Sequence, residues 1–267
     1  MTKHVLSAGT IHVGDWLEAD LTPGYTLAVV DGPYGMGKAA WDRVSIDGLA
    51  DWYAPHIARL SALLAPSASV YLWNTAEGWA RIDPVMRAAG WTFAGLIVWH
   101  KTGANPALIV AAHTGRWPNI TEVCGHYQRG DAFHVNDGTA NVWALSPVND
   151  LGKERLITGE TTIKSKDLLS GAAEYLHPCQ KPLLFAERMI RASTRPGERV
   201  LVPFGGTCRE AVICEWLART NPAEARGYDV CELNADGVDY IGPVLAQIRG
   251  EDTRPKAAGQ VRLFGGS

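Results

Sequence analysis

Short apolar runs alternate with segments of helical periodicity through much of this chain. Buried strands are predicted at residues 27–30, 69–73, 91–99, 200–202 and 227–231. Helices are predicted over residues 49–64, around residues 82–90, from Pro182 through residue 190, and over residues 209–218. Strands that alternate with helices in this way are typical of an α/β fold with a doubly wound, Rossmann-like sheet.

Gly and Pro residues mark the ends of several predicted elements. Pro66 ends the first predicted helix, and Gly90 ends the second. Pro55 falls inside the first helical pattern, so that helix is predicted to start or bend there. Pro182 suits the first helical turn, where a missing backbone N–H costs nothing.

The middle of the chain has a weaker pattern, rich in Gly, Asn, Asp and Pro. We interpret residues 103–173 as a small inserted lobe or a set of long functional loops. Residues 1–102 and 174–250 are then the two halves of one main domain. Residues 251–267 are predicted to form a loose tail.

Composition narrows the class of protein. The 267 residues are 46% hydrophobic and 20% charged, which suits one sizeable globular domain and argues against broad disorder. No apolar run approaches the roughly 20 residues of a membrane helix, and the start of the chain lacks a signal-peptide core, so a cytoplasmic protein with no membrane association is predicted. The net charge of -3 gives no support for a nucleic-acid partner. Any evidence for such a partner must come from sequence motifs.

The cysteines and histidines do not predict a metal site. The five cysteines form no CxxC pair, so reduced thiols are expected rather than a disulfide framework. Cys124 and His126, with His113 and His134 nearby, match the spacing of no common zinc module. Polar and packing residues of an irregular lobe explain them more simply.

An acidic residue directly follows the first of these strands. In open α/β sheets ligands bind beyond such strand ends, and here the segment is Asp31-Gly32-Pro33-Tyr34. The Asp31 carboxylate and the Gly32 carbonyl can both accept N–H bonds from an exocyclic amino group, which favours a pyramidal nitrogen with an available lone pair. Pro33 stiffens the turn, and Tyr34 offers an aromatic face for an extruded base. Taken alone, Asp31 could equally be a helix cap or turn residue.

Two later segments also indicate a binding site. Residues 177–182 read His-Pro-Cys-Gln-Lys-Pro, an uncommon string in which two prolines fix a loop that carries a lysine. Residues 202–208 read Val-Pro-Phe-Gly-Gly-Thr-Cys and follow a predicted strand. A strand, a Gly-containing turn and a helix form the usual cradle of a nucleoside cofactor.

Together these segments resemble the amino-DNA methyltransferases. Their catalytic signature is Asp/Asn/Ser-Pro-Pro-Tyr/Phe, from which this chain departs only at Gly32. Residues 177–182 are similar to the family's His-Pro-Thr-Gln-Lys-Pro segment. Residues 202–208 are similar to its Asp-Pro-Phe-x-Gly-Ser-Gly turn, with Val202 in the Asp place and Cys208 in the second Gly place. The order, with the catalytic segment first and the cofactor segments last, resembles the circularly permuted β group, whose target-recognition region lies mid-chain.

The resemblance implies S-adenosyl-L-methionine as the cofactor. Val202 removes an acid that could pair with the cofactor's ammonium group. Asp229 matches the acid that holds the ribose hydroxyls, and Asp15 matches a residue beside the adenine. The cofactor-binding residues predicted in this way are Asp15, Trp16, His177, Gln180, Lys181, Phe204, Gly205, Gly206, Thr207 and Asp229.

The same resemblance implies double-stranded DNA as the substrate, with the target base flipped out and methylated on adenine N6 in a restriction-modification setting. It allows a homodimer and a cognate restriction endonuclease as partners. Cationic residues in and beside the middle segment are the candidates for DNA contacts, although a solvated loop surface explains any single one of them. They are Lys38, Lys101, Arg116, Arg129 and Lys164.

Three alternatives stay open. Asp31 favours adenine, because cytosine-N4 members more often carry Ser there, but cytosine N4 remains an alternative target. The departures at Gly32, Val202 and Cys208 would suit a catalytically silent DNA-binding protein. A protein-amide or RNA methyltransferase could use the same amino-group geometry.

Overall fold

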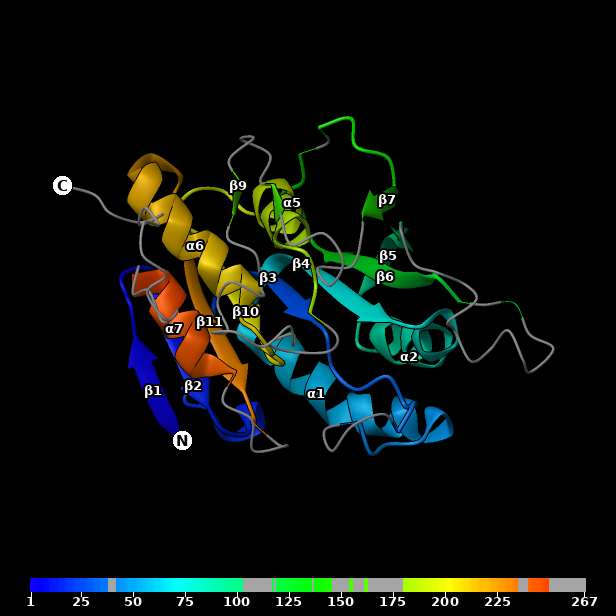
Figure 1. Cartoon of the computed structure of the whole chain (residues 1–267). Helices are drawn as coiled ribbons and strands as arrows, with labels where there is room; N and C mark the ends of the chain where they lie inside the picture. Colours follow the sequence, from blue (N-terminus) through cyan, green and yellow to red (C-terminus); the bar gives the residue numbers. More distant parts are fainter. Residues whose placement is uncertain are drawn as a thin grey trace, which may run out of the picture.

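The computed structural model describes residues 1–37, 42–102, 117, 119–135, 137–145, 154–155, 161–162, 180–234 and 240–249. Nine strands of these residues form one sheet in the order β1-β2-β11-β10-β3-β4-β6-β5-β7 (Figure 1). The strands are β1 (Thr2–Val5), β2 (Gly9–Val13), β3 (Tyr25–Val30), β4 (Leu64–Asn74), β5 (Thr92–Lys101), β6 (Thr121–Arg129), β7 (Val142–Leu145), β10 (Arg199–Val202) and β11 (Gly227–Glu232). Two short strands, β8 (Glu154–Arg155) and β9 (Thr161–Thr162), pair separately.

The helices form two groups, one on each face of the sheet (Figure 1). They are α1 (Leu49–Leu63), α2 (Ala76–Ala88), α5 (Leu183–Ser193), α6 (Arg209–Thr220) and α7 (Ile241–Arg249). Three short 3-10 turns lie between them, η1 (Trp16–Glu18), η2 (Ile46–Gly48) and η5 (Pro222–Glu224). In β3, Leu27 and Val29 pack into the core beneath α5, α6 and α7, whereas Ala28 and Val30 pack into the core beneath α1 and α2. This double burial explains the continuous apolar run of the strand.

The connections diverge between β10 and β3, which are parallel neighbours. From β3 the chain passes through α1 to β4, whereas from β10 it passes through α6 to β11 on the other side. A crevice opens where the two crossovers part, at the carboxyl ends of the strands. This topological switch point places Asp31, after β3, beside the turn that follows β10.

The structure confirms the predicted doubly wound α/β class, and the strands and helices predicted from apolar periodicity are present. Thr75 begins α2 by accepting a hydrogen bond from Gly78 N at 3.0 Å, and Gly90 follows the helix with a φ of 86°. A helix was predicted to start or bend at Pro55, and the first alternative is wrong, because α1 begins at Leu49 and includes this proline. Strands β1 and β2 were not predicted, since their sequence is short and polar.

The middle segment is only partly described. Within residues 103–173, β6 and β7 belong to the main sheet rather than to a separate lobe, with β6 hydrogen-bonded between β4 and β5. Most of the remainder and the whole tail lie outside the described residues, so the domain boundaries remain predictions. Among the described residues no helix is both long and apolar enough to span a bilayer.

Candidate active site

A cavity of about 400 Å³ opens at the carboxyl ends of β3 and β10. Its walls come from the loops after these strands, the segment before α5, the turn around η1 and the exposed edge of α1. The residues predicted from sequence that line it are Asp15, Trp16, Asp31, Gly32, Pro33, Tyr34, Gln180, Lys181, Phe204, Gly205, Gly206 and Thr207. The fold therefore brings together segments nearly 200 residues apart in the chain. His177 lies outside the described residues.

The loop after β3 is held from two sides. The buried Asp42 carboxylate accepts hydrogen bonds from the backbone amides of residues 34–36 at 2.7–3.0 Å. The Pro33 carbonyl accepts hydrogen bonds from the Tyr53 hydroxyl at 3.1 Å and the Asn74 side-chain amide at 3.2 Å. These contacts fix the backbone that presents Asp31 to the cavity.

Gly32 fills a position with no room for a side chain. A Cβ built on Gly32 would lie 2.7 Å from the Tyr53 hydroxyl oxygen and 3.0 Å from the Phe204 ring. A proline ring needs more space than a single Cβ. Glycine replaces the proline of the Asp-Pro-Pro-Tyr pattern here because Tyr53 and Phe204 leave no room for a proline ring.

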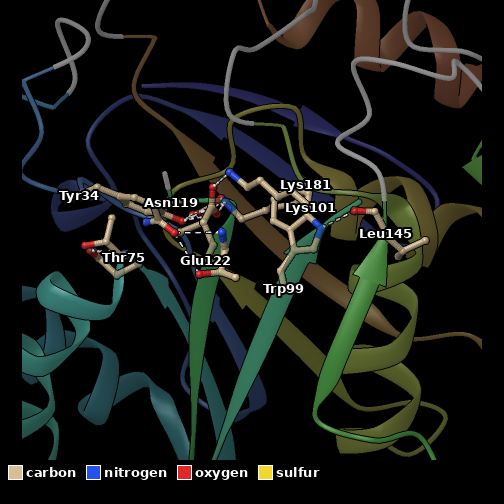
Figure 2. Close-up of polar contacts among 11 residues, drawn as sticks. Tyr34, Thr75, Trp99, Lys101, Asn119, Glu122, Leu145 and Lys181 are labelled. Carbon is tan, nitrogen blue, oxygen red and sulfur yellow. Dashed lines mark hydrogen bonds and ion pairs between the residues drawn. The ribbon is translucent and has the colours of Figure 1, made fainter. Parts of the chain in front are cut away.

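Asp31 lies in a cluster with four other ionisable side chains, which Figure 2 labels as Tyr34, Lys101, Glu122 and Lys181. Lys181 Nζ lies 3.0 Å and 2.9 Å from the two carboxylate oxygens of Asp31, and 3.0 Å from Glu122 Oε2. The Tyr34 hydroxyl donates to Asp31 Oδ1 at 2.8 Å and also contacts Glu122 at 3.1 Å. Lys101 pairs with the other oxygen of Glu122. Two acids thus share two lysines and one phenol, and Asp31, Tyr34 and Lys181 of this cluster line the cavity.

The charges of this cluster stabilise one another. Burial would raise the pKa of Glu122, but the ammonium groups of Lys181 and Lys101 outweigh it and hold that pKa at about 2. Burial would lower the pKa of Lys181, yet Asp31 and Glu122 raise it above the usual lysine value. Burial, together with Asp31 and Glu122, raises the pKa of Tyr34 well above its ordinary value, so its hydroxyl keeps its proton.

The turn after β10 forms a tight backbone cradle ahead of α6. Gly205 N donates to Cys231 O at 2.7 Å, and a Cβ on Gly205 would lie 2.5 Å from Val230. Gly206 and Cys208 both have left-handed backbones, with φ of 50° and 48°. The Cys208 side chain is buried in the core rather than on the cavity wall. The cradle therefore keeps its shape although a cysteine stands where the family pattern has glycine.

Asp229 does not line the cavity, so this placement gives no support to its predicted ribose contact, which stays a prediction. Its carboxylate accepts hydrogen bonds from Tyr25 and Arg199 at 2.9 Å and 2.8 Å, and lies 2.7 Å from a His12 ring nitrogen. Strand β11 continues three residues further than Asp229, to Glu232. Glu232 lines the cavity and accepts a hydrogen bond from Gly206 N at 2.6 Å. The predicted strand, residues 227–231, stopped one residue before Glu232, and Asp229 was selected through the family resemblance rather than as the last residue of the strand.

Four aromatic rings border the other side of the cavity. His56 stacks on Trp52 with ring centroids 4.0 Å apart, and Phe204 lies edge-on to both Trp16 and His56. Trp16 Nε1 donates to His56 Nδ1 at 2.8 Å, so the remaining ring proton of a neutral His56 is on Nε2. Burial lowers the pKa of His56 to about 4, which keeps the ring neutral. Such a wall suits the flat face of a purine.

Two polar side chains in the cavity wall receive no hydrogen bond from another described residue. Gln180 is 6% exposed, and neither its amide nitrogen nor its amide oxygen has a hydrogen-bond partner among the described residues. Glu210, in the first turn of α6, is 7% exposed, and the backbone hydrogen bond to its carboxyl comes from its own amide. Buried polar atoms are almost always satisfied in folded proteins, so the Gln180 amide indicates a polar ligand in this cavity. With the aromatic wall and the glycine cradle, the residues fit S-adenosyl-L-methionine.

The predicted DNA contacts are only partly within the structure. Lys38, Arg116 and Lys164 lie outside the described residues. Lys101 does not line the cavity; it is paired with Glu122 and lies over the Trp99 ring. Arg129 donates to the carbonyls of residues 61, 64 and 65 and pairs across the sheet with Ala68, whereas the site lies at the Asn74 end of β4. Its guanidinium links β6 to the end of α1 and the start of β4, which favours a structural role, and its DNA contact stays a prediction.

Comparison with known proteins shows similarity to DNA methyltransferases in both sequence and structure. The chain is 26% identical over 253 residues to the Type II methyltransferase M1.MboII of Moraxella bovis, a match that covers 88% of this chain and 94% of that protein. The PvuII DNA methyltransferase, described as cytosine-N4-specific, has a similar structure with a TM-score of 0.65, 15% identity, and coverage of 92% of this chain and 94% of that one.

The M1.HpyAVI-SAM complex is also similar, with a TM-score of 0.59, 17% identity, and coverage of 89% of this chain and 98% of that one. At these identities the two structures establish the fold alone. The sequence profile of the DNA methylase family N6_N4_Mtase matches residues 25–243 and includes both the catalytic loop and the glycine cradle. This chain belongs to that DNA methylase family.

Proposed function

We propose that this chain is an S-adenosyl-L-methionine-dependent DNA methyltransferase that methylates the N6 amino group of adenine. One observation carries the proposal: the Asp31 carboxylate and the cradle at Gly205 and Gly206 line the same cavity. An acceptor for an amino group and a holder for a nucleoside cofactor therefore face each other across one space.

The cofactor would lie along this cavity with its parts against chemically matched walls. The rings of Trp16, Trp52, His56 and Phe204 suit its adenine, and the Glu232 carboxylate suits its ribose hydroxyls. The unpartnered Gln180 amide suits the methionine end. When bound, the cofactor supplies a methyl group on a positively charged sulfur. The chain itself supplies positioning and electrostatic stabilisation.

Asp31 has one acceptor position left for the target base. A carboxylate has about four lone-pair sites. Lys181 contacts both oxygens and Tyr34 contacts Oδ1, which leaves the second position on Oδ2. An N–H of the target amino group donates to this position, and the second N–H donates to the Gly32 carbonyl.

The target nitrogen must lose a proton once it is methylated. Asp31 accepts its N–H, and the side chain is 24% exposed, so the proton can leave through Oδ2 to water. Lys181 holds both carboxylate oxygens of Asp31 in place. Asp31 therefore acts in this proposal as a positioned hydrogen-bond acceptor.

The base reaches this site by leaving the DNA helix, since its amino group is otherwise inside the duplex. Lys181 Nζ lies 5.3 Å from the centre of the Tyr34 ring, so a base that stacks on Tyr34 uses the opposite face. Target recognition by the middle segment, the permuted β-group assignment, a homodimer, a partner endonuclease and a cytoplasmic location remain predictions from the resemblance or from composition.

Adenine is favoured because the first catalytic residue is Asp. The second candidate target is cytosine N4, favoured by the structural similarity to the PvuII enzyme. Both bases present an NH2 group that the same two acceptors can hold.

Product analysis tests the proposal. The protein is incubated with unmethylated genomic DNA and cofactor labelled in the methyl group, and the DNA is digested to nucleosides. We expect label in N6-methyl-2′-deoxyadenosine from DNA and no label in any nucleoside when RNA of matched sequence replaces it. Label in N4-methyl-2′-deoxycytidine identifies the second candidate. Cofactor binding by calorimetry without label in any nucleoside contradicts the enzymatic proposal and favours the silent DNA-binding protein.

A further inference from the structure

Four carboxylic acids among the described residues line the cavity, and three of them have evident partners. Asp15 caps η1 by accepting from Leu17 N at 2.9 Å. Asp31 is held by Lys181 and Tyr34. Glu232 accepts from the backbone amides of Gly206 and Asn234, at 2.6 Å and 3.0 Å. The fourth acid is Glu210, and it differs from the others.

Glu210 is buried in the cavity wall without a donor from another residue in the described part of the chain. It lies in the first turn of α6, next to Arg209, whose Nε bonds the Lys181 carbonyl at 3.1 Å. Asp31, Arg209 and Lys181 are the charged residues that act on its carboxyl, and all three line the same cavity as Glu210. The unpartnered Gln180 amide lines this same cavity.

A buried carboxyl that accepts only from its own backbone amide is costly when it is ionised. Burial raises the pKa of Glu210 to about 7 and outweighs that hydrogen bond, so without a further donor the carboxyl is only partly charged at neutral pH. A cationic donor would supply the missing hydrogen bonds and favour the charged form. The site is therefore built for a ligand that carries a positive group at this place.

The strand end beside Glu210 offers no alternative acid. β10 ends at Val202, which also lines the cavity and presents only methyl groups there. S-adenosyl-L-methionine carries one ammonium group, on the amino-acid part of the molecule. Glu210 is the one cavity acid among the described residues that is not already used by the protein.

We propose that Glu210 binds the α-ammonium group of S-adenosyl-L-methionine. The inference rests on the proposed function for the identity of the ligand. It assigns the ammonium contact to the first turn of α6, in place of the strand end occupied by Val202. Glu210 thus determines specificity: it favours a ligand with an α-ammonium group over one that has the adenosine and carboxylate but lacks the ammonium group.

The test compares two ligands by calorimetry: S-adenosylhomocysteine, and its deamino analogue, which lacks only the ammonium group. Wild type, Glu210→Gln and Glu210→Gln combined with Val202→Asp are measured at pH 8. We expect wild type to prefer S-adenosylhomocysteine over the analogue by roughly 10- to 100-fold, as for a hydrogen-bonded charge. Glu210→Gln should remove this preference and leave affinity for the analogue unchanged. The combined variant should recover part of the preference, because it returns an acid to the neighbouring strand end.

Thermal unfolding of each variant shows that it is folded before binding is measured. If Glu210→Gln keeps the wild-type preference, or if wild type has no preference while it binds both ligands, the assignment of Glu210 is overturned. If folded wild type binds neither ligand, the proposed function itself fails, which separates the two outcomes.

Discussion

Lys181 and Asp31, 150 residues apart in sequence, form an ion pair in which one ammonium contacts both carboxylate oxygens, at 3.0 Å and 2.9 Å. The lysine comes from the segment before α5, and the aspartate follows β3. Because the lysine side chain is 10% exposed, water screens this pair only weakly. The contact joins the predicted methionine-end loop directly to the predicted acceptor of the target base.

The partner acid Glu122 should make stability depend on acid pH. Its pKa of about 2 is below the value in an unfolded chain, so its contribution is present above about pH 4.5 and is lost as the pH falls towards 2. We expect Glu122→Gln to lower the free energy of unfolding at pH 7 by on the order of 3 kcal/mol. The difference from wild type should shrink as the pH falls through this window.

Chemical denaturation at pH 7, 5 and 3 measures this effect. Asp47→Asn is a suitable control, because Asp47 pairs with Arg81 at 3.1 Å on the surface and such pairs contribute little. A difference between wild type and Glu122→Gln that does not change with pH contradicts the assigned charge of Glu122.

Gly32 should not tolerate a side chain unless Tyr53 is changed as well. A Cβ at this position meets the Tyr53 hydroxyl at 2.7 Å, so Gly32→Ala should cost about 1–3 kcal/mol of stability. In a Tyr53→Phe background the same substitution should cost less, because the nearest atom is gone. A double-mutant cycle measured by denaturation gives the coupling. Equal costs in both backgrounds would show that the hydroxyl does not restrict the position.

Much of the fold was predictable because both faces of β3, β4 and β10 are buried, and buried strands give continuous apolar runs. The residues of the catalytic loop and the glycine cradle could also be identified, since each lies within a short local motif. The position of Glu122 beside Lys181 could not be predicted from local sequence. It reaches Lys181 only because β6 runs antiparallel beside β4, a pairing between distant segments.

The same reasoning explains the failures. Asp229 and Glu232 are both acids near the end of a strand, and only the register of β11 beside β10 decides which one reaches the cavity. Arg129 resembles a surface cation in sequence, yet its guanidinium donates to three backbone carbonyls at the end of α1 and the start of β4. The aromatic wall member His56 carries no local signal except its place on the apolar face of a helix.

Asp229 and Glu232 should have separable roles. Asp229→Asn removes the charge that faces Arg199 and should cost roughly 3 kcal/mol of stability, while cofactor affinity of the folded protein changes little. Glu232→Gln should weaken the cofactor about tenfold, because the ribose loses a charged acceptor. Calorimetry with S-adenosylhomocysteine beside denaturation curves distinguishes them. A reversed pattern would return the ribose contact to Asp229.

Cofactor affinity should fall as the pH falls through neutrality. Burial raises the pKa of Glu210 to about 7, and binding of an ammonium group favours its charged form, so binding releases a proton below that pH. The dissociation constant should rise about tenfold per pH unit well below pH 7. Asp31, Lys181 and Arg209 also face this carboxyl. Glu210→Gln is therefore the control, and it should flatten the pH dependence of binding between pH 6 and 8. If the dissociation constant of Glu210→Gln keeps the wild-type pH dependence, the proton released on binding comes from another group.

The central claim is that the Asp31 carboxylate receives the target amino group. The most direct measurement combines single-turnover methyl transfer to DNA with cofactor calorimetry on Asp31→Ala. We predict that transfer falls by about 100- to 1,000-fold or more while the dissociation constant for the cofactor stays within a few-fold of wild type. Transfer at the wild-type rate by Asp31→Ala would contradict the account.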